Sequence, residues 1–357
     1  MRMSDFPPIH SFADALEMSK SFTDSAGKKR LLLGNGFSMA CFGGFGYTAL
    51  YERVKNLGIP EKVQRIFEKY GETNFEAVLK LLDDSSWIAE TYDLCPDGSQ
   101  SEIKKDYEVL KLALTNAITE VHPEHRGLIT DEKYNACYSF ISNFDDIYTV
   151  NYDLLLYWTS LHREPFSFTD SFSKDEDTDG NDCEFMPHNY ADGRGLYFLH
   201  GALHLYSDGK VVRKRVWKET NIPLVTQIRT ALEDKKYPLV VAEGDSDSKL
   251  EHIQESSYLS NCLRKFRGIQ GHLFTFGHSL SDQDRHIVEV ISKNVELRHL
   301  WIGIRGDFTK ATNQRFLDLA QKMQQQRKDH IGDKKVGKKK GDLTVHFYDA
   351  DSANVWG

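Results

Sequence analysis

A run of three leucines that stops at a glycine turn constrains the fold of this chain more than any other feature. Basic residues 28–30 lead into Leu31–Leu33, and Gly34-Asn35-Gly36-Phe37-Ser38 follows directly. A short apolar run with a polar flank is typical of a buried central strand in a parallel sheet. A strand, a glycine turn and the start of a helix commonly hold a phosphate on exposed backbone N–H groups. The same Gly-x-Gly pattern also occurs as a purely structural turn, so this motif alone decides neither reading.

Similar apolar runs recur along the chain and alternate with helical patterns. The strands are expected at 146–150, 196–199, 211–216, 237–242, 272–276, 301–304 and 343–348. Helical spacing is seen at 10–22, 47–82, 103–121, 134–144, 222–232, 248–266 and 308–323. This alternation predicts an α/β protein with a Rossmann-like, doubly wound and mainly parallel sheet.

Polar residues follow several of the predicted strands, where ligands bind in open α/β sheets. Asn151 and Asp153 follow the strand at 146–150, which includes Thr149. The first could equally be a turn residue and the second a helix cap. His200 and Gly201 follow the run at 196–199; a glycine there is expected to leave one face of the imidazole open for proton transfer.

The late segment 277–282 completes the set of strand ends. Gly277, His278 and Ser279 follow the strand at 272–276, and Asp282 stands three residues further on. Ser281 or Asp282 is expected to cap the next helix.

Composition excludes several classes of protein. The formal net charge of -8 argues against a general nucleic-acid binder. No apolar run approaches the roughly 20 residues that cross a bilayer, and the N-terminus lacks the apolar core of a signal peptide, so a cytoplasmic protein is expected. The five cysteines are odd in number and never form Cys-x-x-Cys, which favours neither a disulfide framework nor a zinc site.

Four of these strand ends, in order, resemble the motifs of the sirtuin superfamily. Gly34–Ser38 is similar to Gly-Ala-Gly-x-Ser, and Thr149–Asp153 is similar to Thr-Gln-Asn-Ile-Asp. His200-Gly201 and Gly277–Ser279 correspond to the later His-Gly and Gly-x-Ser. The chain more closely resembles the bacterial sirtuin-like proteins of anti-phage defence and their relatives of the DUF4917 type. The four-cysteine zinc ribbon of the protein deacylases is missing, and residues 42–46 replace their Gly-Ile-Pro-x-Phe-Arg stretch.

The resemblance implies an NAD+ hydrolase that cleaves the nicotinamide–ribose bond, with NAD+ as substrate and no metal. Asn151 is then expected to hold water or the ribose hydroxyls, His200 to act as general base, and Asp153 to stabilise the loop or contact the nicotinamide side. The dinucleotide-binding set implied by the resemblance is Gly34, Asn35, Gly36, Phe37, Ser38, Thr149, Gly201, Gly277, His278, Ser279 and Asp282. Within it, the first glycine loop is expected to bind pyrophosphate.

Two other functions stay open at this point. One is a module that binds NAD+ or ADP-ribose without turnover, and the other is a protein deacylase or ADP-ribosyltransferase. The resemblance further implies an abortive-infection effector, a homo-oligomer, and a companion defence protein such as an ATPase. Neither a membrane nor nucleic acid is an expected direct partner.

The expected organisation places an N-terminal helical extension at 1–27 before a catalytic domain at 28–305. Within that domain lie a helical insertion at about 47–144 and an acidic, irregular loop at about 164–194. Residues 306–357 are expected to complete the domain with a helix and a strand. Two charged segments stand out: an acidic stretch at 175–182, which could be a lid, and a basic run at 334–340, most simply a solvated loop.

Overall fold

The computed structural model describes the chain with short gaps. The described ranges are 7–22, 27–70, 75–95, 100–162, 168–174, 182–187, 193–209, 211–216, 222–234, 236–241, 246–333 and 341–357. The basic run at 334–340 and nearly all of the acidic stretch at 175–182 lie outside them, so the predictions for those segments stay predictions.

An eight-stranded sheet forms the centre of the structure, and every pairing within it is parallel. Its order is β1-β14-β13-β12-β2-β3-β7-β4. The strands are β1 (Ile9–His10), β2 (Lys29–Leu33), β3 (Asp146–Thr149), β4 (Phe168–Thr169), β7 (Arg194–Phe198), β12 (Gly271–Phe276), β13 (Leu297–Ile304) and β14 (Thr344–Asp349). The predicted Rossmann-like sheet is confirmed.

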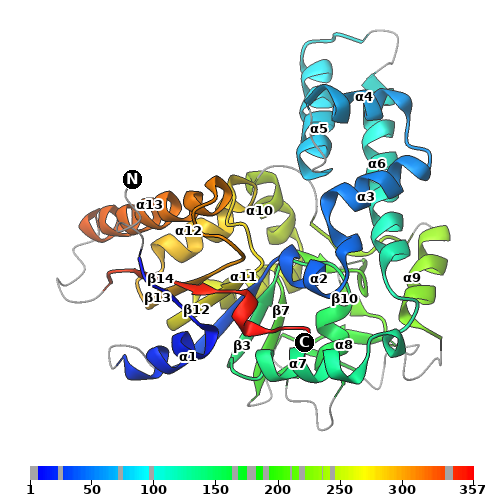
Figure 1. Ribbon diagram of the computed structural model, residues 1–357. Coiled ribbons are helices and arrows are strands. Elements are labelled where there is room, and N and C mark those ends of the chain that lie inside the picture. Colours follow the sequence, from blue (N-terminus) through cyan, green and yellow to red (C-terminus); the bar gives the residue numbers. More distant parts are fainter. Residues whose placement is uncertain are drawn as a thin grey trace.

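The central strands are apolar because helices cover both faces of the sheet (Figure 1). One layer contains α1 (Phe12–Ser21), α7 (Asp131–Ile141) and α8 (Leu155–Ser160), and the other contains α10 (Ser246–Glu255), α11 (Ser257–Arg267), α12 (Arg285–Lys293) and α13 (Ala311–Asp333). Phe12 of α1 meets Phe274 of β12 edge-on, and Phe266 of α11 meets Tyr148 of β3. Two layers of side chains therefore enclose the sheet.

The predicted helical insertion stands away from the sheet (Figure 1). It contains α3 (Tyr47–Asn56), α4 (Glu61–Tyr70), α5 (Phe75–Thr91) and α6 (Gln100–Val121), and α9 (Leu224–Glu233) lies beside α6. It is reached from β2 through α2 (Asn35–Cys41) and the 3-10 turn η2 (Gly43–Phe45). A second short turn, η3 (Arg126–Leu128), leads from α6 to α7.

The segment expected to be an irregular acidic loop contains strands where it is described. A four-stranded antiparallel sheet has the order β5-β6-β10-β9, with β5 at Phe172–Ser173, β6 at Cys183–Phe185, β9 at Leu205–Asp208 and β10 at Val211–Lys214. Lys214 of β10 pairs with Asp170 at 2.7 Å and lies over the ring of Phe172, which anchors this small sheet. Expecting an irregular loop was wrong because β5 and β6 pair with each other, and β6 also pairs with β10 beyond residue 194.

The helix predicted at 248–266 is two helices, so that expectation was also wrong. Ser256 adopts an extended backbone between α10 and α11, and its hydroxyl accepts a hydrogen bond from Leu259 N–H. This is the geometry of a helix N-cap, which ends one helix and begins another. Within the described parts of the chain, no helix is both long and apolar enough to span a bilayer.

Candidate functional site

A cavity of about 390 Å³ opens at the carboxyl edge of the parallel sheet. Its polar side comes from the loops after β2, β3, β7, β12 and β13. Its apolar side includes Phe45 of η2, Leu50 of α3, and Leu114 and Ile118 of α6. The volume lies within the range of about 300–1,000 Å³ typical of small-molecule sites. The insertion therefore supplies one wall of a pocket whose other wall is the sheet edge.

Nine of the residues predicted for the site line this cavity. They are Gly34, Asn35, Gly36, Asn151, Asp153, His200, Gly277, His278 and Ser279. The four loops that the motifs singled out thus converge. Asn35 also ties the turns together, because its Nδ2 donates to the carbonyl of Phe45 at 3.0 Å.

The two glycine loops pack directly on each other, which changes the role predicted for them. Gly34 N–H donates to Phe276 O at 3.0 Å, and Gly36 N–H donates to Gly277 O at 2.9 Å. A Cβ on Gly34 would lie 2.5 Å from the Cα of His278. The prediction that the amides of Gly34 and Gly36 bind pyrophosphate was wrong, since the loop after β12 already uses them.

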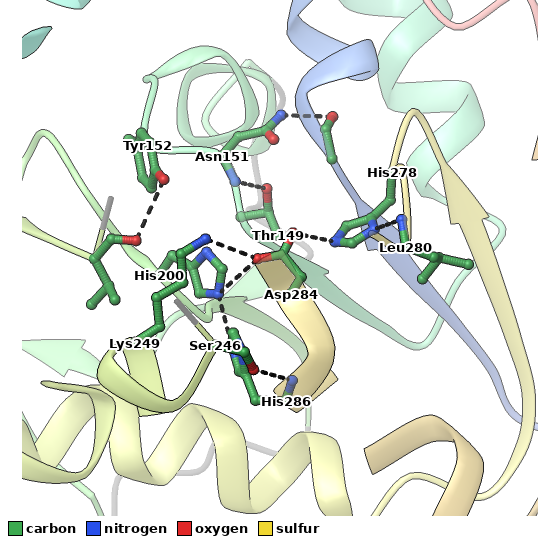
Figure 2. A network of polar contacts seen from close by, with 12 residues as sticks. Thr149, Asn151, Tyr152, His200, Ser246, Lys249, His278, Leu280, Asp284 and His286 are labelled. Carbon is green, nitrogen blue, oxygen red and sulfur yellow. Dashed lines mark hydrogen bonds and ion pairs between the residues drawn. The ribbon is translucent and has the colours of Figure 1, made fainter. Parts of the chain in front are cut away.

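Asn151 is held by its amide nitrogen. Nδ2 donates to Gly34 O at 3.0 Å and to Ser38 Oγ at 2.9 Å. The backbone N–H donates to Thr149 Oγ1 at 3.0 Å (Figure 2). Both amide hydrogens are used, so Asn151 can offer its carbonyl oxygen Oδ1 to a ligand. Ser38 and Thr149 do not line the cavity; they fix Asn151 from behind.

Asp153 is engaged on both carboxylate oxygens. Oδ1 accepts from the N–H of Leu155, the first residue of α8, at 2.9 Å, and Oδ2 accepts from the Ser38 hydroxyl. Burial raises the pKa of Asp153, against the opposing effect of these hydrogen bonds. Of the two roles expected for Asp153, the geometry favours loop stabilisation.

His200 is buried and paired with a second histidine. Its Nε2 lies 3.0 Å from His286 Nε2, and His286 Nδ1 lies 3.0 Å from Ser246 Oγ (Figure 2). Burial lowers the pKa of His200 well below its usual value and that of His286 to about 4, so both rings are neutral near pH 7. A neutral imidazole is the form that can accept a proton.

Gly201 allows two strands to pair closely. Its φ is +79°, and an added Cβ would lie 2.0 Å from the carbonyl oxygen of Leu239. Leu239 belongs to β11 (Leu239–Val240), which pairs antiparallel with β8 (Gly201–Ala202). This glycine therefore permits close strand pairing, and the expectation that it opens one face of His200 stays a prediction.

Two further residues predicted to bind the dinucleotide lie outside the cavity lining. Phe37 is fully buried, and its carbonyl accepts from Trp356 Nε1 at 2.9 Å, so it fixes the C-terminus. Asp282 is exposed at the start of the turn η4 (Asp282–Asp284). The prediction chose the wrong carboxylate of this turn, because Asp284 is the one that faces the cavity.

Asp284 is surrounded by groups that can carry positive charge (Figure 2). Its Oδ1 lies 3.1 Å from Lys249 Nζ and 4.0 Å from His200 Nε2, and its Oδ2 lies 3.5 Å from His278 Nε2. Burial opposes ionisation of this carboxyl, but Lys249 and the histidines outweigh it and hold the pKa of Asp284 well below its usual value. The carboxylate is therefore ionised.

His278 directs its proton toward Asp284. Its Nδ1 accepts a hydrogen bond from Leu280 N–H at 2.8 Å, so the neutral ring carries its hydrogen on Nε2. Burial lowers the pKa of His278, which keeps the ring neutral. In the described structure Nε2 is buried without a hydrogen-bond partner, since the contact with Asp284 is long.

One group of side chains has the spacing of a metal site. The ligand atoms of His200, Asp284 and His286 lie within 4.8 Å of one another. The Lys249 ammonium, however, is fully buried against this carboxylate and already supplies a compensating positive charge. That arrangement disfavours a divalent cation at the same place, and we assign no metal to it.

Sequence reasoning missed Lys249, Asp284 and the basic residues at the cavity mouth. Arg305 follows β13, and Arg315 lies in the first turns of α13. Arg305 pairs with Asp351 at 3.3 Å, whereas Arg315 stacks on the ring of Phe316 at 4.6 Å. The polar exit of β13, Arg305-Gly306-Asp307, was the available signal for Arg305, because polar residues follow the neighbouring strands in the same way.

One family model covers all the loops that build the cavity. The family model described as "Domain of unknown function (DUF4917)" matches residues 31–356. No curated protein matches the chain. The matched range includes both the parallel strands that position the cavity and the helical insertion that forms its apolar wall.

Proposed function

The chain belongs to the DUF4917 family, and we propose that it is an NAD+ hydrolase of the sirtuin-like type. The reaction gives nicotinamide and ADP-ribose. The observation that carries the proposal is the convergence of Asn151 and His200, from adjacent strands, on one cavity lined by both glycine loops. An amide acceptor and a neutral imidazole beside one another suit the cleavage of a sugar–base bond.

The chemistry of the bond sets what the protein must supply. Cleavage passes through an oxocarbenium-like state, as in other glycoside hydrolyses. Nicotinamide leaves from a positively charged ring nitrogen, so no acid is needed to protonate it. The site must instead hold the ribose and accept a proton from water. Asn151 Oδ1 accepts from a ribose hydroxyl, and its fixed Nδ2 sets the direction of that bond.

His200 accepts the proton through the nitrogen that His286 leaves unoccupied. A consistent arrangement has His200 Nε2–H donating to His286 Nε2, and His286 Nδ1–H donating to Ser246 Oγ. Nδ1 of His200 then keeps its lone pair, and the described residues offer it no hydrogen-bond partner. This proton arrangement is part of the proposal, because the opposite tautomers satisfy the same two contacts.

The rest of the dinucleotide uses surfaces that the motifs did not include. The apolar wall at Leu114 and Ile118 suits a flat aromatic base, and Arg315 at the mouth suits the diphosphate. Arg315 takes over the role first assigned to the amides of the glycine turn. Following the resemblance, we further propose a role in anti-phage defence, as a homo-oligomer with a companion protein such as an ATPase.

A second candidate is a module that binds NAD+ or ADP-ribose without turnover. It is favoured by the burial of His200, which is 1% exposed and bonded to another histidine, as a structural histidine would be. The two functions predict the same ligand and differ only in product formation.

Incubation of the purified protein with NAD+ and chromatography of the products tests the proposal. We expect equal amounts of nicotinamide and ADP-ribose. Asn151→Ala and His200→Ala should each lower the rate by at least about 100-fold, because each removes a group that acts on the reacting sugar or water. His252→Ala is the matched control, since His252 is exposed on α10.

The outcomes separate the candidates. NAD+ that stays intact but binds measurably would support the binding module. Label transferred from NAD+ to protein would support a transferase. Unchanged turnover in a folded Asn151→Ala or His200→Ala variant would remove that residue from the mechanism.

A further inference from the structure

A buried ion pair borders the cavity, and the roles proposed so far do not use it. The side chain of Lys249 is 0% exposed, and its Nζ lies 3.1 Å from Asp284 Oδ1. Asp284 itself is 14% exposed and lines the cavity. Such a pair contributes little net stability, because desolvation of both charges offsets much of their attraction. Its position at the cavity therefore points to a chemical role instead of a structural one.

The two carboxyl groups that line the cavity differ in how many of their oxygens already have close hydrogen-bond partners. Asp153 accepts hydrogen bonds on both oxygens, from Leu155 N–H and from Ser38. The ammonium of Lys249 keeps Asp284 ionised. The distances from the Asp284 carboxylate to His200 Nε2 and His278 Nε2, 4.0 and 3.5 Å, are longer than those of good hydrogen bonds. Of the two, Asp284 keeps acceptor capacity that a bound sugar can meet.

We propose that Asp284 is a catalytic carboxylate that stabilises the positive charge on the ribose during cleavage, and that Lys249 is its positioning residue. This inference rests on the proposed NAD+ hydrolysis. The C1′–N bond breaks and its electron pair goes to the nicotinamide ring nitrogen, which becomes neutral. A water oxygen provides the pair for the new C1′–O bond, and the proton lost from water goes to His200. Asp284 takes no proton; it acts electrostatically on the developing oxocarbenium ion.

The surrounding histidines fit that assignment. Three imidazoles face Asp284 from three elements: His200 after β7, His278 after β12, and His286 on α12. All three are neutral near pH 7, because burial lowers the pKa of each. The carboxylate therefore retains its charge for the substrate, with the Lys249 ammonium as its ion-pair partner.

Asp284→Asn tests the catalytic role. We expect kcat for NAD+ to fall by at least about 100-fold, the size seen when one electrostatic contact to a transition state is removed. Binding of ADP-ribose, measured by calorimetry, should change only a few-fold, because ADP-ribose lacks the cationic ring. Asp247→Asn is the matched control: Asp247 is 71% exposed and lies two residues from Lys249. A folded Asp284→Asn protein with normal kcat would overturn the proposal.

Lys249→Gln tests the positioning role through the pH profile. Without the ammonium, the pKa of Asp284 rises. On acidification the carboxylate is then protonated at a higher pH than in the parent protein. The acid limb of kcat should therefore move to higher pH, while Lys249→Arg should keep it near that of the parent protein. The titratable groups that still face Asp284 are His200, His278 and His286, and Arg315 acts on His278. An acid limb unchanged in Lys249→Gln would contradict the assignment.

Loss of one partner leaves a buried charge, so either single variant can fail to fold. The double variant Asp284→Asn with Lys249→Gln removes both charges and keeps similar volumes. We expect it to fold, to bind ADP-ribose and to lack turnover; turnover at the parent rate would overturn the proposal. An inactive parent protein refutes the NAD+ hydrolase, whereas an active parent with an active double variant refutes only the role of Asp284.

Discussion

Single side chains in this protein act through the charge state that burial gives them. His122, His200 and His286 are buried, and burial lowers the pKa of His122 and of His286 to about 4. His122 accepts a hydrogen bond on Nε2 from Leu154 N–H at 3.0 Å, so the native fold uses its unprotonated form. The fold and the proposed chemistry therefore both require neutral imidazoles.

This requirement predicts that acid destabilises the protein. Between about pH 6.5 and pH 4 the unfolded chain binds protons on these histidines and the folded chain does not, so the free energy of unfolding falls as the pH falls. We expect Tm to decrease by several degrees between pH 7 and pH 5 in thermal unfolding followed by circular dichroism. His286→Asn should reduce this dependence and the exposed His252→Asn should not; a Tm that is flat across the range in the parent protein contradicts the argument.

Where two strands pair closely, a glycine can be indispensable. Gly201 and Gly209 both have positive φ, at +79° and +62°, but only Gly201 has a neighbour within the reach of a Cβ. The carbonyl of Leu239 presses on Gly201 because β8 and β11 pair there. The two positions thus separate backbone strain from steric contact.

Gly209→Ala should cost about 1 kcal/mol in the free energy of unfolding, from the left-handed backbone alone. Gly201→Ala should cost about 3 kcal/mol or more, since the Cβ also forces β8 away from β11. Urea unfolding of both variants measures the difference. Because His200 precedes Gly201, NAD+ turnover should also fall in the Gly201 variant but not in the Gly209 variant. Equal costs in the two variants would show that the strand pairing yields easily.

The whole molecule combines an acidic chain with a basic cavity mouth. The formal net charge is -8, which repels an anionic dinucleotide at long range. Arg305 after β13 and Arg315 of α13 are exposed residues of the cavity lining, and the helical insertion supplies its apolar wall. Local attraction at the mouth then has to offset the overall field.

Arg315→Ala should therefore raise KM for NAD+ about 10-fold, the effect of removing one charged hydrogen bond worth about 1.5 kcal/mol. The KM for nicotinamide riboside, which has no phosphate, should stay the same. Arg65→Ala, an exposed arginine on α4, is the control for net charge. A similar change with both substrates would place Arg315 in structure instead of phosphate binding.

Local patterns were sufficient for the central strands of the parallel sheet and for the place where the candidate cavity forms. Leu31–Leu33 and the run at 272–276 lie in adjacent central strands, and the residues after them meet as predicted. Parallel strands place their carboxyl ends at one edge, so residues 151 and 200 came together without any long-range information. Apolar periodicity and turn residues depend only on residues that are close together in the sequence, so they can be recognised without a structure.

Long-range packing decided what each residue at those turns does. The amides of Gly34 and Gly36 donate hydrogen bonds to Phe276 and Gly277 at the end of β12, and Gly201 lies where β8 pairs with β11. Lys249 came from a helix with no motif, and it pairs with Asp284, the carboxylate of this turn that lines the cavity. Hydrogen-bond partners and burial depend on segments far apart in the chain, so the strand order had to be known before the carboxylate and the lysine could be paired.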